Sequence, residues 1–265
     1  MNAPNTTMPV VFLSHGSPTL PFDEIPARSF MVGLGAKLPR PKAILCISAH
    51  WEADVASLTG AAAPETIHDF YGFPKALYEL KCDAPGSPEL ASRVAGLLKD
   101  AGIEAKIDPK RGFDHGVWNP LMLLYPQSGI PVVQLSLLGG QSTAAHVALG
   151  RALAPLREEG VLILASGGAV HNLRWLDWSN KGGVTDWARD FDRWVGARVE
   201  AGDEPALIDY REDAPNAPLA HPSEEHFLPL FVALGAAEAK SPKGKRLHDS
   251  FVFGSLSMAA YGWGM

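Results

Sequence analysis

Residues 43–52 read AILCISAHWE, and this stretch decides the expected fold. Its first six residues form a short apolar run with turn residues before it and polar residues after it, as a buried strand does. Similar runs occur at residues 10–13, 132–137 and 161–165. Helical apolar spacing is found at residues 88–101, 143–158 and 186–201, the first with Ser87 as N-cap and Pro88 at the first helical position. Strands that alternate with helices predict an α/β fold with a mainly parallel central sheet flanked by helices.

The composition is that of an ordinary globular protein. Of 265 residues, 46% are hydrophobic and 20% are charged, and no composition break indicates a linker, so we expect a single domain over residues 1–265. The net charge of −6 argues against nucleic acid as a partner. No apolar run reaches the roughly 18 residues of a membrane span, and the first residues do not resemble a signal peptide. We read Cys46 and Cys82 as reduced thiols of a cytoplasmic protein.

Three histidines directly follow predicted strands. His15 follows the run at 10–13, His50 follows the run at 43–48, and His171 follows the run at 161–165 through a Gly-Gly turn. Ligands of open α/β sheets bind beyond the carboxyl ends of the strands, so these side chains are expected to converge there. A hydrogen-bonded structural histidine is the alternative for each one taken alone. Together they indicate a metal site at the C-terminal ends of the strands.

His226 is a further candidate ligand. Ser223 is a credible N-cap, which would place His226 in the first turn of a helix. The positive end of the helix dipole disfavours imidazolium, and metals bind the neutral ring.

Other residues are candidates for contact with a substrate or for proton transfer. His115 and His171 lie in predicted loops with glycine neighbours, where acid–base groups are often placed, although each has a structural alternative. Trp51 is placed to form a wall of the site. His68 is placed to line a pocket, unless Asp69 simply holds its ring. The sequence contains neither a G-x-S-x-G elbow nor a phosphate-binding loop.

Seven segments together resemble the DOPA-type branch of the class III (LigB-like) extradiol ring-cleavage dioxygenases. They occur in the same order from about residue 8 to the end of the chain and are LSHGSP (13–18), SAHWE (48–52), IHDFYGFP (67–74), GFDHGVW (112–118), ASGGAVHNL (165–173), EHFLP (225–229) and GSLSM (254–258). The resemblance implies one α/β catalytic domain and one divalent metal, with Fe(II) in active members and Zn(II) in some isolated forms.

Carried over by position, the resemblance implies that His15, His50 and His226 bind the metal. Extradiol enzymes of the wider class often use two histidines and a glutamate, so the resemblance leaves Glu225, directly before His226, as the alternative ligand. His171 would be an acid–base group beside the metal or a fourth ligand, and His115 would contact the substrate and move protons. The implied reaction is the opening of a catechol ring by O₂. With L-DOPA, 4,5-cleavage gives 4,5-seco-DOPA, which cyclises spontaneously to betalamic acid, and 2,3-cleavage gives a muscaflavin-like isomer.

Two other functions remain as alternatives at this stage. The same histidines around zinc suit a hydrolase, because zinc lowers the pKa of a bound water to about 7. The other alternative is a non-catalytic protein that binds a metal or a small ligand with the same fold. Oxygen uptake with Fe(II) and catechols separates the three functions.

Overall fold

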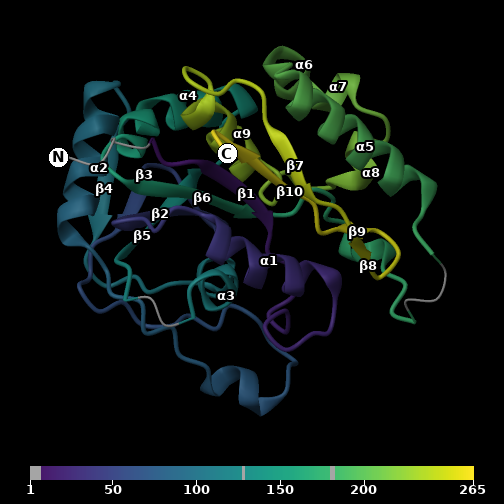
Figure 1. The fold of residues 1–265 in the computed structure, drawn as a ribbon, viewed down its shortest axis with the longest axis horizontal. Helices are drawn as coiled ribbons and strands as arrows, with labels where there is room; N and C mark the ends of the chain where they lie inside the picture. Colours follow the sequence, from purple (N-terminus) through teal and green to yellow (C-terminus); the bar gives the residue numbers. More distant parts are fainter. Residues whose placement is uncertain (1–6, 127–128, 180–182) are drawn as a thin grey trace.

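The computed structural model describes residues 7–126, 129–179 and 183–265. Figure 1 shows a central sheet with helices on both faces. The strands are β1 (Val10–Ser14), β2 (Ala43–Ala53), β3 (Ala56–Thr59), β4 (Ala105–Asp108), β5 (Val132–Leu138), β6 (Val161–Gly167), β7 (Lys245–His248), β8 (Phe251–Val252), β9 (Leu256–Ser257) and β10 (Ala260–Trp263). The α-helices are α1 (Pro26–Lys37), α2 (Pro88–Asp100), α3 (His115–Leu124), α4 (Thr143–Leu153), α5 (Asp186–Ala201), α6 (Glu204–Ile208), α7 (Tyr210–Asp213), α8 (Ala217–Ala220) and α9 (Leu228–Ala237). Short 3₁₀ helices span Lys75–Glu79, Ala154–Arg157 and Leu173–Trp175.

The large sheet has the strand order β4-β3-β5-β2-β6-β1-β10-β7. Its four central strands, β5, β2, β6 and β1, are parallel to their neighbours within this group. Antiparallel pairs occur where β3 meets β5 and where β10 meets β1 and β7. The prediction of an α/β fold with a mainly parallel sheet is therefore confirmed.

The central strands are buried on both faces because successive side chains alternate between two cores. On β1, Val10 and Phe12 belong to the core that contains residues of α2, α4, α5 and α9. Val11 and Leu13 belong to the opposite core, which contains residues of α1 and α3. Figure 1 shows α1 and α3 on one side of the sheet and α4, α9 and α5 on the other.

The predicted helices are confirmed with one difference. The Ser87 side chain accepts a hydrogen bond from the backbone N–H of Leu90 and caps α2, and α5 has the predicted bounds. The helix expected over residues 143–158 is α-helical only to Leu153 and then tightens into the 3₁₀ turn at 154–157. Pro155 explains the change, because it lacks the N–H that the α-helical pattern would need there.

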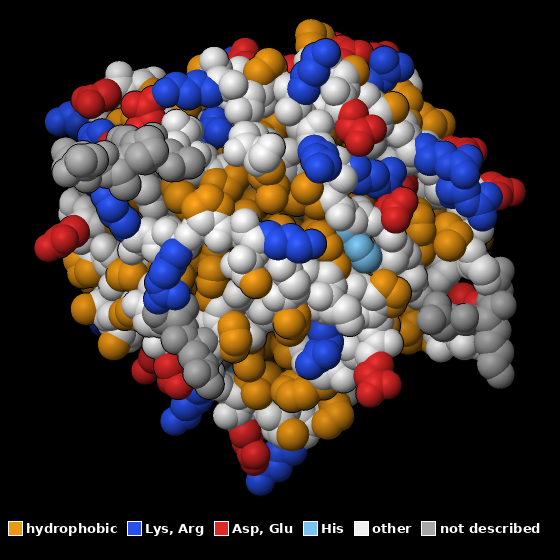
Figure 2. All heavy atoms as spheres, in the orientation of Figure 1, with side chains coloured by type: hydrophobic (Ala, Val, Ile, Leu, Met, Phe, Trp, Pro, Cys, Tyr) orange, Lys and Arg blue, Asp and Glu red, His pale blue; other side chains and the backbone are white. Residues whose placement is uncertain are grey.

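The surface carries charges of both signs. Figure 2 shows Lys and Arg side chains interspersed with Asp and Glu, with hydrophobic side chains gathered toward the lower part of this face. Among the described residues, no helix has the length and hydropathy that crossing a membrane requires.

Candidate metal centre

The parallel sheet brings three histidines to one edge. His15 directly follows β1, His171 follows β6, and His50 lies near the end of β2. Since β1, β6 and β2 are adjacent and parallel, their carboxyl ends lie together. The ring centres of His15 and His50 are 4.9 Å apart, and all three histidines line one cavity. The predicted convergence of these residues is confirmed.

The position of His50 differs from the prediction, because β2 does not end at Ser48 but continues to Ala53. Its pairing with β5 is regular up to Ile47, which faces Leu135, and resumes at Glu52, which faces Leu137. The extra residues of β2 form an irregularity that contains His50. Irregularities of this kind can re-aim side chains beside functional sites, and His50 lies within this one.

His115 is the first residue of α3 and not part of a loop as expected. The residue before it, Asp114, is fully buried and accepts a hydrogen bond of 2.7 Å from the Ser48 hydroxyl. Burial raises the pKa of Asp114, although the hydrogen bonds that it accepts act against this. The ring of His115 lies 3.9 Å from that of His50, centre to centre. The start of α3 therefore adds a fourth imidazole to the cluster.

His226 joins the cluster by a different route from the predicted one. Helix α9 begins at Leu228, and the hydroxyl of Ser223 donates to Glu225 rather than capping that helix. A tertiary contact holds the backbone instead, since the carbonyl of His226 accepts a hydrogen bond of 2.8 Å from the N–H of Gly168. A Cβ on Gly167 would lie 2.1 Å from the same carbonyl oxygen, so only glycine allows this approach.

The five histidines fall into two groups of candidate ligand atoms within the described residues. Nitrogens of His15, His50 and His115 lie within 4.8 Å of one another, and so do ligand atoms of His171, Glu225 and His226. The ring of His226 lies 5.4 Å from that of His15 and 4.9 Å from that of His50. By their ligand atoms, His15 and His50 are therefore grouped with His115, and the predicted third ligand, His226, is grouped with His171 and Glu225.

Oxygen partners fix the tautomers of the rings. Nδ1 of His15 lies 3.0 Å from the hydroxyl of Ser166, and that hydroxyl donates its only proton to the carbonyl of Gly116. The Ser166 oxygen must therefore accept a hydrogen bond from a protonated Nδ1 of His15, which leaves Nε2 of that neutral ring unprotonated. Oδ1 of Asp69 lies 2.9 Å from Nδ1 of His115, and Oδ2 lies 3.2 Å from Nδ1 of His50.

Burial favours the neutral form of four of the rings, those of His15, His50, His171 and His226. It lowers the pKa of His15 and of His226 well below the usual value, and the neighbouring histidines lower it further. Burial and His115 lower the pKa of His50 to about 3, against the opposite effect of Asp69. For His171, burial lowers the pKa to about 4. Neutral imidazole is the form that binds a metal.

The two best-defined rings fit a metal ion. Nε2 of His15 and Nε2 of His50 are 3.0 Å apart. With both Nδ1 atoms protonated toward oxygen partners, two lone pairs face each other across this distance. A cation removes the repulsion between them, and nitrogens at this separation can both bind one ion at about 2.1 Å. The chemistry of this donor set therefore suits a divalent metal.

His171 differs from the other four rings. It stacks on His226 with ring centres 3.5 Å apart, but none of the described residues forms a hydrogen bond with its imidazole. Both ring nitrogens are therefore available to a substrate or a metal.

The histidines line a cavity of about 680 Å³ whose other walls are mainly apolar. These walls include residues of the β8–β9 hairpin and of the segment 70–73. Its larger apolar side chains are Phe70, Tyr71, Phe73, Val170, Leu173, Leu176, Trp178, Phe253, Leu256 and Met258. Among the described lining residues there is no Lys, Arg, Asp or Glu, so the cavity suits a mainly aromatic ligand.

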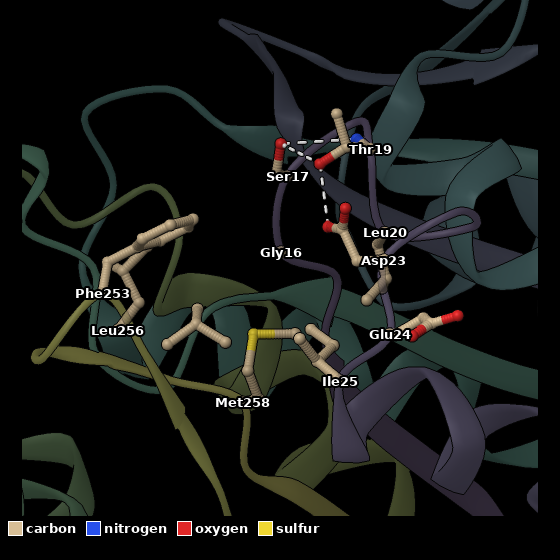
Figure 3. A pocket seen from close by; sticks show the side chains of 11 residues that line it. Gly16, Ser17, Thr19, Leu20, Asp23, Glu24, Ile25, Phe253, Leu256 and Met258 are labelled. Carbon is tan, nitrogen blue, oxygen red and sulfur yellow. Dashed lines mark hydrogen bonds between the residues drawn. The ribbon is translucent and has the colours of Figure 1, made fainter. Parts of the chain in front are cut away.

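A smaller pocket of about 250 Å³ adjoins this cavity and shares Gly16, Ser17 and Thr19 with it. Figure 3 shows these residues facing Phe253, Leu256 and Met258 across the space. The hydroxyl of Thr19 donates a hydrogen bond of 2.8 Å to Asp23.

Two of the predicted substrate contacts lie outside the cavity lining. His68 turns toward the carbonyl of Leu80, 3.1 Å from its Nε2, and Arg111 stacks on Trp51 at 4.2 Å from the ring centre. His115, the third predicted contact, does line the cavity. Asp69 does not hold His68 as considered from the sequence but contacts His50 and His115.

Sequence reasoning missed the oxygen partners Asp69 and Ser166. Asp69 is directly beside His68 in the chain, and this adjacency suggested the wrong partner. Ser166 directly follows the apolar run at 161–165, and no role was predicted for it. A signal for Ser166 exists in hindsight, because a serine at the carboxyl end of a central strand is next to the strand-end histidines.

The fold and the site define a class of protein, namely α/β enzymes with a cluster of neutral histidines beside an aromatic cavity. The chain matches the family described as the catalytic LigB subunit of aromatic ring-opening dioxygenase over residues 10–264. It is 45% identical over 254 residues to a 4,5-DOPA dioxygenase extradiol of Beta vulgaris, covering 94% of each chain. It is 42% identical to a protein of the same name from Escherichia coli K12, covering 96% of this chain and 94% of that protein.

A solved structure agrees with this assignment. The crystal structure of an uncharacterised protein of Escherichia coli K12 has a TM-score of 0.79 and 36% identity to this chain, covering 96% of it and 99% of that protein. The chain therefore belongs to the LigB family of aromatic ring-opening dioxygenases and is an extradiol dioxygenase. Enzymes of this family depend on a metal and act on a small aromatic substrate with O₂.

Proposed function

We propose that this enzyme binds one divalent metal through His15, His50 and His226 and opens the ring of L-DOPA by 4,5-extradiol cleavage. The observation that carries this proposal is the 3.0 Å distance between Nε2 of His15 and Nε2 of His50 at the cavity, while Nδ1 of each ring contacts an oxygen atom. When bound, the metal would supply a site for both catechol oxygens and for O₂ and a path for electrons between them.

The two remaining histidines handle protons in this proposal. Nδ1 of His115 is engaged by Asp69, so Nε2 is the nitrogen that accepts a proton from a catechol hydroxyl. His171 has no hydrogen-bond partner among the described residues and lies parallel to His226, so it can take or return a proton as the ring opens. A fourth-ligand role for His171 is the alternative.

The substrate proposal rests on the cavity and on the relatives. Aromatic and aliphatic side chains surround the histidines, as a catechol ring requires, and two relatives are named 4,5-DOPA dioxygenase extradiol. The polar groups near the mouth include the hydroxyls of Ser17 and Thr19, which can bind the polar end of L-DOPA. The product would be 4,5-seco-DOPA, which cyclises to betalamic acid.

The active metal in this proposal is Fe(II), with Zn(II) as an inactive occupant of the isolated protein. Neutral imidazoles bind both ions, but only iron has the redox chemistry that O₂ requires. Both cysteines are free thiols, which fits a reducing compartment, so we place the enzyme in the cytoplasm.

Oxygen uptake tests the proposal. The protein is loaded anaerobically with Fe(II) and mixed with L-DOPA, dopamine, 3-(3,4-dihydroxyphenyl)propionate and 4-methylcatechol, with tyrosine as the monophenol control. We expect one O₂ consumed per L-DOPA and a yellow product with the mass of betalamic acid. The 2,3-isomer among the products would correct the cleavage position. No O₂ uptake with any catechol, together with hydrolysis of an ester by the zinc form, would refute the dioxygenase proposal.

A further inference from the structure

Among the described residues outside the histidine cluster, Asp69 is the one whose side chain lies within 3.2 Å of two of its histidines. Oδ1 lies 2.9 Å from Nδ1 of His115, and Oδ2 lies 3.2 Å from Nδ1 of His50. The same Oδ1 also accepts a hydrogen bond of 3.0 Å from the backbone N–H of His115. Both carboxylate oxygens are thus occupied by the two imidazoles.

The segment that carries Asp69 is held firmly against the start of α3. The backbone N–H of Ile67 donates to the carbonyl of Phe113, and that of Phe113 donates to Glu65, each over 2.8 Å. The indole of Trp118 donates to the carbonyl of Ile67 over 3.0 Å. These bonds hold residues 65–67, just before Asp69, against residues 113 and 118 on either side of His115. The carboxylate of Asp69 is therefore preorganised.

Gly112 allows the segment before Asp69 to lie close to the segment before His115. A Cβ on Gly112 would lie 2.0 Å from the carbonyl oxygen of Glu65, a distance that no side chain can accept. The next residues after Asp69, from Phe70 to Phe73, line the cavity. Asp69 therefore lies between the cavity-lining residues 70–73 and the histidines that it contacts.

We propose that Asp69 is a positioning residue that fixes His50 and His115 together, each with Nδ1 protonated and Nε2 directed to the reaction site. This inference rests on the proposed metal centre, in which His50 binds the ion and His115 moves the substrate proton. A carboxylate suits this role because it accepts hydrogen bonds from two donors at once and donates none. Outer partners of this kind typically change metal affinity or activity by about 10- to 100-fold.

Asp69→Asn tests the inference with little change in shape. An amide has only one acceptor oxygen, so its NH₂ group must face one of the two rings. That ring has to move its proton from Nδ1 to Nε2, where the proton blocks the lone pair. We expect zinc affinity, measured by chelator competition, to fall about 10- to 100-fold. In ¹⁵N spectra of the zinc form, one of the two Nδ1-protonated signals assigned to His50 and His115 should disappear.

Two variants serve as matched controls. Glu225→Gln changes a carboxylate whose Oε1 contacts only His226 among the clustered rings, at 2.9 Å, so it should lower zinc affinity but leave the His50 and His115 signals unchanged. Asp100→Asn, at the exposed end of α2, should change neither property. Asp69→Glu keeps both acceptor oxygens and should retain both signals.

Three results would overturn the inference. The first is wild-type zinc affinity with both ring signals intact in Asp69→Asn. The second is a loss of zinc affinity that is as large in Asp69→Glu as in Asp69→Asn with no tautomer change in either. The third is a pair of results, in which the metal-free Asp69→Asn protein is unfolded and Asp69→Glu, under the same conditions, is folded but has lost an Nδ1-protonated signal of His50 or His115. None of these readouts uses ring cleavage, so an iron-loaded wild type that cleaves no catechol would refute the proposed function separately.

Discussion

Replacement of Ser166 by alanine isolates the hydrogen bond that orients His15. The Ser166 hydroxyl is fully buried, donates to the carbonyl of Gly116 and accepts from Nδ1 of His15. Alanine removes both bonds without adding volume. Two buried polar groups then lose their partner, and the protein must either leave them unsatisfied or let the imidazole of His15 change tautomer.

The magnitude follows from these two outcomes. A buried group left without its partner costs about 1–3 kcal/mol in the free energy of unfolding. In a domain of this size, 1 kcal/mol shifts Tm by about 2–4 °C. If His15 instead moves its proton to Nε2, some stability is recovered but the lone pair facing His50 is lost. Zinc affinity should then fall about 10- to 100-fold.

The assay measures both quantities in the same samples, with Tm from calorimetry of the metal-free protein and zinc affinity from chelator competition. Ser136→Ala is the matched control, because Ser136 is also a fully buried strand serine and accepts a hydrogen bond from the N–H of Ser57. It should lose a similar amount of stability and keep its zinc affinity. Equal zinc affinity in Ser166→Ala, Ser136→Ala and the wild type would refute the role assigned to Ser166.

Three further outcomes are expected. Gly167→Ala should destabilise the protein by about 1–3 kcal/mol in denaturant unfolding, since its Cβ would lie 2.1 Å from the carbonyl oxygen of His226; an unchanged midpoint would contradict the close approach. His226→Ala should lose bound metal by elemental analysis while His115→Ala keeps it and loses turnover, and the reverse result would exchange their roles. The free energy of unfolding of the metal-free protein should fall as pH drops below about 6.5, where histidines of the unfolded chain become protonated. In the folded protein the pKa is about 4 for His171 and about 3 for His50, so these rings stay neutral in that range. Equal unfolding free energies at pH 7.5 and pH 5 would argue against neutral buried rings.

The sequence predicts the scaffold well because the signals are local. Each central strand is a short apolar run that must be buried on both faces, and parallel strands carry whatever follows them to a common edge. This logic suffices to bring His15, His50 and His171 together. The cap of α2 was predictable for the same reason, since Ser87 contacts a backbone N–H only three residues away.

Long-range contacts explain what the sequence did not predict. The local pattern suggested a helix cap at Ser223, but a hydrogen bond between Gly168 and the carbonyl of His226 fixes that segment across the fold. The extra residues around His50 are visible only in the pairing of β2 with β5. Neither feature has a signature within a few residues of the histidine that it positions.

Local signals predict which residues are candidate ligands, whereas long-range contacts determine how their rings are oriented. A histidine can bind a metal through either ring nitrogen, so its presence at a strand end does not fix which lone pair faces the site. Here the choice is made by oxygens from elsewhere in the chain, with Ser166 on β6 serving His15 and Asp69 serving both His50 and His115. These partners leave the Nε2 atoms of His15 and His50 3.0 Å apart, an arrangement that a cation stabilises.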